Sequence, residues 1–240
     1  MIDAYVSTFI STSYACLKNK GTHRAVKEVQ EGMKHCKSKW NEYYILKMDV
    51  AKYFQSIDKN ILYNIIKRKI KDDKLLWLIR QIIYSSPNLK GIAIGNYTSQ
   101  LFANVYLNEI DQYIKHKLKV KYYYRYMDDS VLFVETKREA KDILAKIIDF
   151  LKNNLELELN SKTQIFKNKQ GVNFCGYKIN EYRLKIRDRG KKKIKKKIKS
   201  LKKKIKEGKS SSFEAKKYLS GHLGYIQYAD VHNLTKKIFY

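Results

Sequence analysis

The sequence is poor in the residues that interrupt or cross-link a chain. Among its 240 residues there is one proline, Pro87, and three cysteines, Cys16, Cys36 and Cys175, with no C-x-x-C pair. This pattern argues against a disulfide framework and against a zinc finger or ribbon, and it makes a reducing cytoplasm the expected compartment. Glycine/serine-rich linkers and internal repeats are also missing. No apolar run approaches the roughly 18 residues of a membrane span, and no signal-peptide pattern follows Met1, so we expect no membrane partner.

Acidic residues are scarce relative to basic ones. The chain has 23 Asp and Glu against 51 Lys and Arg, a formal net charge of +28 at pH 7. With 44 % hydrophobic and 13 % aromatic residues it can still bury a core, so it is not a disordered basic tail. Such a charge favours a polyanionic partner, because each neutralised phosphate releases condensed counterions. We therefore expect nucleic acid rather than an anionic membrane surface.

Hydrophobic periodicity predicts an α+β fold. The expected strands lie at residues 43–50, 122–126 and 130–135, with shorter strand pieces around 165, 172–179 and 184–186. One expected helix begins after an N-cap at Asp58. Further helices are expected at about 74–84, 98–114 and 137–153. This order describes a domain built on an antiparallel sheet, not a doubly wound parallel one.

The character of the chain changes at Lys191, so we expect a boundary near Asp188. A lysine-rich stretch there repeats apolar residues at helical spacing, at Ile194, Ile198, Leu201 and Ile205, and ends at Gly208. This predicts a cationic helix with one narrow apolar stripe. A last helical piece is expected from about 212 to 228.

Three acidic residues stand out against the basic background. Asp49 ends a predicted strand, and Asp128 and Asp129 lie between two others. If the strands are neighbours, Asp128 can meet Asp49, and carboxylates so close are costly unless a cation binds between them. Two Mg²⁺ ions suit this arrangement, because Mg²⁺ takes few protein carboxylates and completes its shell with water and phosphates. The alternative is a strand-end residue and a polar hairpin turn.

The sequence around these acids resembles reverse transcriptases. Tyr126 to Asp129 match the Y-x-D-D signature, and Asp49 is followed five residues later by the aromatic Phe54, as in the first catalytic palm motif. The segment 95–100 resembles the G-x-x-x-S-Q form found in diversity-generating retroelements. Segments 13–15 and 21–25 resemble the fingers. Segment 159–163 resembles the motif that follows the Y-x-D-D turn, and segment 174–177 resembles the F-x-G-Y primer grip. The motifs keep their order over about residues 10–187.

The resemblance implies a right-hand polymerase. Its palm would be an antiparallel sheet with helices packed on one face, accompanied by partial fingers and a helical thumb. The implied domains are partial fingers at 1–42, a palm at 43–187 with fingers helices at about 58–90, and a basic helical thumb at 188–240. Compared with the diversity-generating group, the chain begins almost at the fingers segment. A truncated sequence, a misassigned start codon and a compact variant all remain open explanations.

The resemblance also implies metal ligands. Asp49 and Asp128 would hold two Mg²⁺ ions, for which Mn²⁺ can substitute, with Asp129 as a weaker ligand. The backbone of Val50 would contribute an oxygen. These residues would form the catalytic centre for two-metal phosphoryl transfer.

Other residues would contact the incoming dNTP. Phe54 would lie under its sugar as a steric gate against a ribose 2′-hydroxyl; the alternative is a core aromatic. Gln100 would touch minor-groove acceptors of the templating pair. Lys162 would act as proton donor or charge partner for the pyrophosphate, the alternative being a solvated lysine. Arg24 would reach the triphosphate, the alternative being an arginine on a helix surface.

Template and primer contacts would come from both halves of the chain. Ser99 opens the helix facing the templating pair, with a capping role for Thr98 or Ser99 as the alternative. Gly176 would permit a tight turn near the primer. Tyr177 is a primer contact or a core residue.

The thumb would grip the product duplex through the lysine helix, with Lys195 and Lys199 on phosphates. Membrane binding by this amphipathic helix is the alternative.

The implied activity is RNA-directed DNA polymerisation with dNTPs on an RNA template and a DNA or RNA primer. The G-x-x-x-S-Q segment implies error-prone copying in a bacterial or phage-encoded diversity-generating retroelement, with a possible small basic accessory protein. The alternatives are a phage-defence, retron or group II intron-like reverse transcriptase, or a catalytically impaired RNA-binding scaffold.

Overall fold

The computed structural model describes residues 5–208, and beyond them residues 211, 213, 214, 217, 220, 228 and 229. The chain divides into two compact units, Met1–Asn168 and Lys169–Tyr240, which are described separately below. No helix in the described part of the chain is both long enough and apolar enough to cross a membrane.

The first unit is built on a four-stranded antiparallel sheet with the strand order β2-β3-β1-β4. Its strands are β1 (Tyr44–Asp49), β2 (Tyr122–Tyr126), β3 (Asp129–Val134) and β4 (Gln164–Lys167). The strands expected at 43–50, 122–126, 130–135 and around 165 are therefore confirmed. The antiparallel α+β architecture is confirmed as well.

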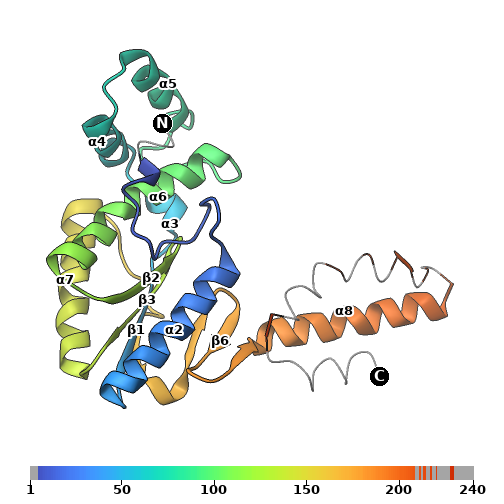
Figure 1. Cartoon of the computed structure of the whole chain (residues 1–240). Coiled ribbons are helices and arrows are strands. Elements are labelled where there is room, and N and C mark those ends of the chain that lie inside the picture. Colours follow the sequence, from blue (N-terminus) through green and yellow to red (C-terminus); the bar gives the residue numbers. More distant parts are fainter. Residues whose placement is uncertain are drawn as a thin grey trace. The chain divides into compact units, whose positions relative to one another are not determined.

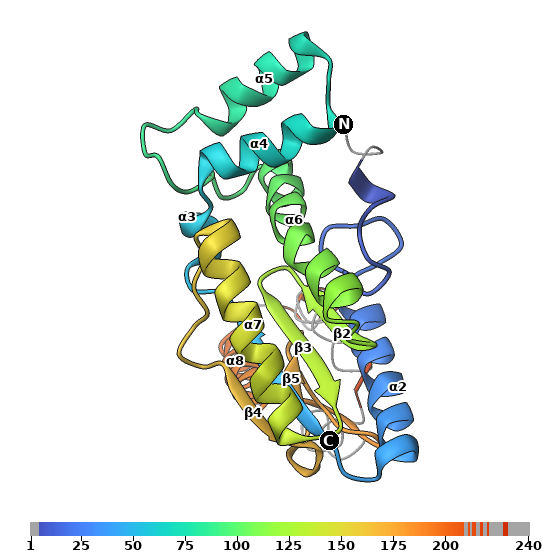
Figure 2. The ribbon, with the colours of Figure 1, turned by 90° about the vertical axis from the view of Figure 1, so that its left-hand side faces the viewer.

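Helices cover both faces of this sheet, which corrects the expectation of helices on one face. On one side lie α6 (Tyr97–Gln112) and α7 (Lys137–Leu155), and on the other lies α2 (Thr22–Trp40) (Figures 1 and 2). Tyr123 donates a hydrogen bond to Asp111 of α6, whereas its neighbour Tyr124 packs against Gly32 of α2. Successive strand residues point to opposite faces, so two buried neighbours require a cover on each side.

Short helices connect β1 to α6. They are α3 (Tyr53–Ser56), α4 (Lys59–Lys69) and α5 (Asp73–Ile83). The predicted N-cap is confirmed: an Asp58 carboxylate oxygen accepts hydrogen bonds from the backbone N–H groups of Asn60 and Ile61, both at 2.9 Å. At its other end, α6 continues into a π-helical turn, η1 (Tyr113–Lys117).

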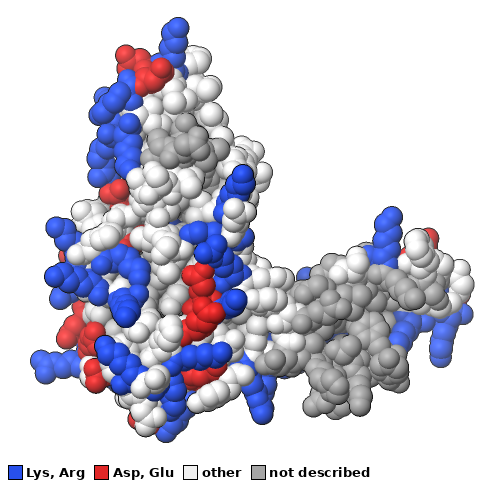
Figure 3. All heavy atoms as spheres, viewed as in Figure 1, with Lys and Arg blue, Asp and Glu red and all other residues white. Residues whose placement is uncertain are grey.

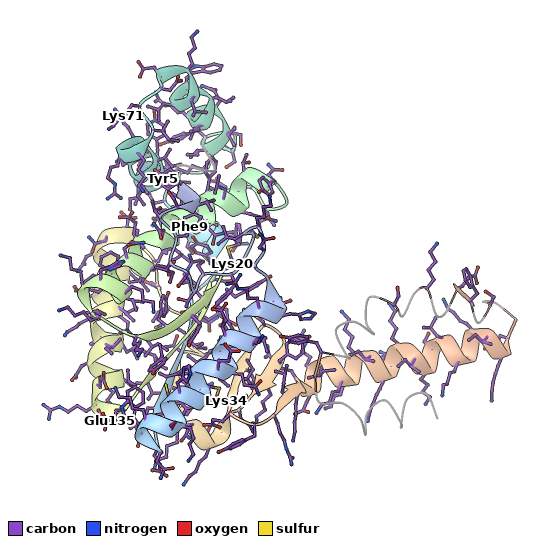
Figure 4. The ribbon with its side chains drawn as sticks, in the orientation of Figure 1. Tyr5, Phe9, Lys20, Lys34, Lys71 and Glu135 are labelled. Carbon is purple, nitrogen blue, oxygen red and sulfur yellow. The ribbon has the colours of Figure 1, made fainter. Side chains whose placement is uncertain are left out.

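The segment before α2, residues 5–21, contacts both α4 and the edge strand β2. The Tyr5 hydroxyl lies 3.0 Å from the carbonyl oxygens of Ile65 and Ile66 in α4. Ser13 forms a parallel bridge to Arg125 of β2. The Lys20 ammonium donates to the carbonyl of Ser13 at 2.9 Å, which holds this segment in place (Tyr5 and Lys20 are labelled in Figure 4).

The second unit contains a three-stranded antiparallel sheet of β5 (Val172–Phe174), β6 (Tyr177–Ile179) and β7 (Leu184–Ile186). The helix α8 (Asp188–Lys206) follows the sheet, and a short 3₁₀ turn, η2 (Asn168–Gln170), lies just before β5. The expected cationic helix is confirmed, and Ile194 and Ile198 of its stripe are buried. Most of the helix expected at 212–228 lies outside the described residues. The fingers, palm and thumb boundaries stay predictions.

Candidate active site

The two distant acidic stretches meet at one end of the four-stranded sheet. Asp49 is the last residue of β1 and pairs with Asp129, the first residue of β3. Asp128 lies in the two-residue turn that joins β2 to β3, between the paired residues Tyr126 and Asp129. The N–H of Val50 donates to the carbonyl oxygen of Asp128 at 3.3 Å. The neighbouring strands required by the sequence argument are therefore present.

The carboxyl group of Asp128 experiences both burial and the charge of Asp49. Burial raises its pKa above the ordinary value for Asp, and the nearby Asp49 carboxylate raises it further. Lys47 and Arg125 lower the same pKa, but the net shift is upward. Ionised Asp128 is therefore held in an unfavourable environment. A bound divalent cation would relieve this, because it favours the charged form of both carboxylates.

Asp129 has a different partner. Its carboxylate forms an ion pair with the ammonium of Lys47 on the adjacent strand. Lys47 lies two residues before Asp49, so alternation along β1 puts both side chains on one face. Sequence reasoning did not single out Lys47, although this spacing was a usable signal. The Asp129 carboxylate is thus already paired with a cation, and its role as a weaker metal ligand stays a prediction.

The donor set fits a cation that is completed by substrate. Among the described residues, no group of three or more His, Cys, Asp or Glu side chains is arranged to hold a metal ion alone. Asp49 and Asp128 provide two carboxylates, and Mg²⁺ in phosphoryl-transfer sites commonly uses only one or two, with water and substrate phosphates as its other ligands.

A segment after α7 lies alongside the end of β1. The N–H of Asn160 donates to the carbonyl oxygen of Asp49 at 2.7 Å, and the Ala51 N–H donates to the Glu158 carbonyl at 2.9 Å. The Asn160 side chain then accepts from the backbone N–H of Lys162 at 3.0 Å. The structure thus brings the exposed Lys162 onto a turn next to Asp49.

A buried arginine anchors the β2–β3 turn that carries Asp128, and sequence reasoning missed it. Arg125 is 1 % exposed and binds both carboxylate oxygens of Asp111 in α6, with contacts from 2.6 to 3.0 Å. It also donates to the carbonyl oxygen of Met127, next to Asp128, at 3.0 Å. A charged residue inside the otherwise uncharged strand YYYRY was the available signal, since a buried charge needs a partner.

The residues expected to contact dNTP and template have mixed surroundings. Phe54 on α3 is partly buried against the core, which also suits the core alternative. At the start of α6, Ser99 is 3 % exposed and Gln100 is partly buried. The capping alternative for Thr98 or Ser99 is wrong, because the N-cap is Asn96 and the helix begins at Tyr97.

Arg24 lies on the surface of α2. Its Nε donates to Glu28 Oε1 at 2.7 Å, one helical turn away. This is the arrangement of the helix-surface alternative rather than of a free triphosphate ligand.

In the second unit, Gly176 has a φ of 86° and Cys175 a φ of 48°, so both adopt left-handed backbone in the β5–β6 turn. The expectation that Gly176 permits a tight turn is confirmed. Tyr177 is 0 % exposed, so its side chain is a core residue and the primer-contact interpretation of that side chain is corrected. Lys195 and Lys199 are exposed on α8.

Comparisons with known proteins agree with this geometry. A family model described as reverse transcriptase (RNA-dependent DNA polymerase) matches residues 2–179. The putative COX1/OXI3 intron 2 protein of Saccharomyces cerevisiae is 22 % identical over 241 residues, covering 73 % of this chain and 27 % of the yeast protein. Protein YkfC of Escherichia coli is 24 % identical over 217 residues, covering 72 % of this chain and 56 % of YkfC. The chain therefore spans less than two thirds of these relatives.

Solved structures show the same fold at low sequence identity. Apo telomerase from Candida tropicalis, truncated from its C-terminal domain, matches with a TM-score of 0.60 at 13 % identity, covering 78 % of this chain and 43 % of that one. Telomerase from Candida albicans, in complex with a fragment of telomeric RNA, matches with a TM-score of 0.59 at 13 % identity, covering 78 % and 36 %.

Proposed function

The chain belongs to the reverse transcriptase (RNA-dependent DNA polymerase) family, and on that premise we propose that it adds dNTPs to a primer on an RNA template. The observation that carries this proposal is the meeting of Asp49 and Asp128 at the ends of neighbouring strands. Their two carboxylates, drawn from stretches far apart in sequence, form the centre that phosphoryl transfer requires.

Each residue near the centre has a physical task in this proposal. Asp49 and Asp128 would hold divalent ions, Mg²⁺ or Mn²⁺, and Asp129, paired with Lys47, would balance local charge. When bound there, the two ions supply activation of the primer 3′-hydroxyl and stabilisation of the leaving pyrophosphate. Lys162, exposed beside the end of β1, is available to the pyrophosphate. Arg125 positions the turn through the carbonyl oxygen of Met127.

We further propose that the copying is error-prone, as in diversity-generating retroelements. The support is the segment Gly95 to Gln100, whose last residues open α6. Gln100, at the start of this helix, is only partly buried and so remains accessible to a base pair. The proposed partners are an RNA template, a DNA or RNA primer and a small basic accessory protein.

A second candidate is a reverse transcriptase allied with a group II intron. The similarity to the yeast intron 2 protein favours it. A copying assay on two templates separates the candidates: a diversity-generating enzyme misincorporates mainly opposite template adenines, whereas an intron enzyme copies all four bases with similar accuracy.

Primer extension on an RNA template tests the proposed activity. The wild type should extend the primer with Mg²⁺ or Mn²⁺, and Asp128→Ala should lose at least about 100-fold in rate, equivalent to about 2.7 kcal/mol of barrier. The matched control is Asp142→Ala, which removes an exposed carboxylate from α7. If wild type and Asp128→Ala are equally inert while RNA still binds, the chain is an RNA-binding scaffold and the polymerase proposal is wrong.

A further inference from the structure

The loop between α5 and α6 is fastened to the part of the chain that carries Phe54. The part of the loop concerned is residues 86–92, which we call the 86–92 segment. Its backbone forms an isolated antiparallel bridge between Lys90 and Asp58, just before α4. Figure 2 shows the loop running from α5 back past α4 and α3 to α6. The polymerase chemistry proposed above assigns no task to this segment.

Two backbone amides of the 86–92 segment bind the end of α3. The Ile92 N–H donates to the carbonyl oxygen of Phe54 at 3.0 Å, and the Gly91 N–H donates to the carbonyl oxygen of Ile57 at 2.8 Å. The last carbonyl groups of a helix have no partner within that helix, so these bonds satisfy acceptors that α3 cannot satisfy itself. The backbone of Phe54 is therefore bonded directly to the segment.

The short helix α3 depends on contacts from outside. It has four residues, whereas an isolated helix is marginal even at roughly 12–15 residues. Lys52, immediately before it, has a φ of 44°, in the left-handed region that is unfavourable for a residue with a Cβ. Strained backbone of this kind persists only where the surrounding structure holds it. The position of Phe54 thus depends on the contacts of α3, and the 86–92 segment supplies those at its end.

A buried lysine fixes the other end of the segment. The side chain of Lys59 is 1 % exposed, and its Nζ donates to the carbonyl oxygen and to the hydroxyl of Ser86, both at 2.8 Å. Within the described part of the chain, no carboxylate forms an ion pair with Lys59. Burying an ammonium against neutral acceptors is costly. Holding Ser86 against the start of α4 is a task that requires this ammonium and accounts for it.

Glycine is required where the segment comes closest to α3. Gly91 has a φ of 89°, which lies in the left-handed region. A Cβ added there would lie 3.2 Å from the carbonyl oxygen of Gln55 in α3. Both the backbone conformation and the close approach therefore disfavour a side chain at this position. A methyl group at Gly91 would push the segment and α3 apart.

We propose that the 86–92 segment sets the position of the Phe54 ring, and that Lys59 and Gly91 are positioning residues for the choice between dNTP and rNTP. The inference rests on the proposed function, because it concerns the sugar of the incoming nucleotide. Lys59 and Gly91 act through Phe54 and not by touching the substrate. Steric exclusion of a 2′-hydroxyl requires a ring that stays in place, since a misplacement of about 1 Å is enough to change reaction rates strongly.

Single-nucleotide incorporation by the full chain, with matched rNTP and dNTP, tests the proposal. Lys59→Met keeps the length of the side chain and removes its ammonium, so the ratio of rNTP to dNTP efficiency should rise by about 3–10-fold. Gly91→Ala acts at the other end of the segment and should raise the same ratio, which keeps the proposal testable if Lys59→Met does not fold. The matched control, Lys67→Met, makes the same exchange at an exposed position of α4 and should leave the ratio unchanged. An unchanged ratio in Gly91→Ala and in a folded Lys59→Met would overturn the proposal.

A double-mutant comparison separates positioning from a general loss of structure. In a Phe54→Ala background the ring is gone, so adding Lys59→Met should leave the ratio of rNTP to dNTP efficiency where Phe54→Ala alone puts it. An equal rise of this ratio in both backgrounds would show that Lys59 does not act through Phe54, and the proposal would be wrong.

Amide hydrogen exchange, followed by mass spectrometry, separates this inference from the proposed function. Lys59→Met should speed exchange in residues 89–92, whereas Lys67→Met should not. If the wild type extends primers while Lys59→Met changes neither the exchange nor the ratio, the inference is wrong and the polymerase remains. If the wild type extends no primer while Lys59→Met alone speeds the exchange, the polymerase proposal fails and sugar selection fails with it, but Lys59 still holds the segment.

Discussion

At the residue scale, the buried pair of Arg125 and Asp111 carries the turn that presents Asp128. Removing one partner of such a pair leaves an uncompensated buried charge, which costs about 3–5 kcal/mol. We therefore expect Arg125→Met to lower the Tm by roughly 6–20 °C in a chain of this size. Differential scanning calorimetry measures this directly.

The double variant Arg125→Met/Asp111→Leu is the control for a purely structural role. It removes both buried charges together, so much of the lost Tm should return. Primer extension should stay impaired, because the carbonyl oxygen of Met127 still lacks its guanidinium donor. Full recovery of activity together with stability would show that Arg125 does not position the turn.

Phe54 is the residue that we propose to select the sugar of the incoming nucleotide. Its ring is partly buried on α3, close after Asp49, and its centroid lies 5.6 Å from that of the Tyr53 ring. Phe54→Ala should raise the efficiency of ribonucleotide incorporation relative to dNTPs by about 10–100-fold, or about 1.4–2.7 kcal/mol. Single-nucleotide incorporation with matched rNTP and dNTP measures the ratio. Phe54→Tyr keeps the ring and should keep the selection. An unchanged ratio in Phe54→Ala would remove Phe54 from the gate role.

At the scale of elements, alternation and capping predicted most of the fold. The strands at 43–50, 122–126 and 130–135, the Asp58 cap and the cationic helix all follow from local patterns that the structure confirms. The sequence argument for Asp49 and Asp128 also needed only one long-range assumption, that their strands are neighbours. Strand order is a non-local property, so local sequence patterns do not determine it. Only the resemblance to reverse transcriptases indicated that the two strands are neighbours.

Periodicity alone could not predict that α2 covers the second face of the four-stranded sheet. A strand in which Tyr122, Tyr123 and Tyr124 are all buried indicates two covered faces, but the pattern does not say which helix lies on which face. The ion pair of Lys47 with Asp129 depends on strand register in the same way. Burial of Tyr177 depends on which face of the small sheet is covered, which the motif itself does not determine.

The packing of α2 on β2 gives a prediction at this scale. A methyl group at Gly32 would collide with the ring end of Tyr124, whose carbon Cζ lies 2.8 Å from the added atom. Gly32→Ala should therefore cost about 1–3 kcal/mol, as overpacking does. Urea denaturation measures it. Gly32→Ala/Tyr124→Ala frees the space and should show a smaller additional loss from the glycine change; an equal loss in both backgrounds would mean that the contact does not limit the packing.

At the scale of the whole molecule, basic side chains outnumber acidic ones. On the face drawn in Figure 3, Lys and Arg side chains occur at many separate places, and Asp and Glu occur in smaller groups. The net charge of +28 supports steering of polyanions from solution. The acidic pair of Asp49 and Asp128 is therefore an exception in its surroundings.

This charge predicts strongly salt-dependent RNA binding. If the chain contacts about six or more phosphates, its affinity for RNA should fall by about 10³-fold or more between roughly 50 and 200 mM salt. Fluorescence anisotropy over a KCl series measures the slope. A flat response would contradict a binding mode dominated by phosphates.

Direct observation of divalent ions tests whether Asp49 and Asp128 form the metal centre of a polymerase. Electron paramagnetic resonance can follow the titration of Mn²⁺ into the full chain bound to a primer–template and a non-hydrolysable dNTP analogue. We expect tight Mn²⁺ binding by the wild type and by Asp142→Asn/Asp149→Asn, which neutralises two exposed carboxylates of α7. We expect that binding to be lost in Asp49→Asn/Asp128→Asn. Undiminished Mn²⁺ binding by Asp49→Asn/Asp128→Asn would show that these two carboxylates do not hold the ions.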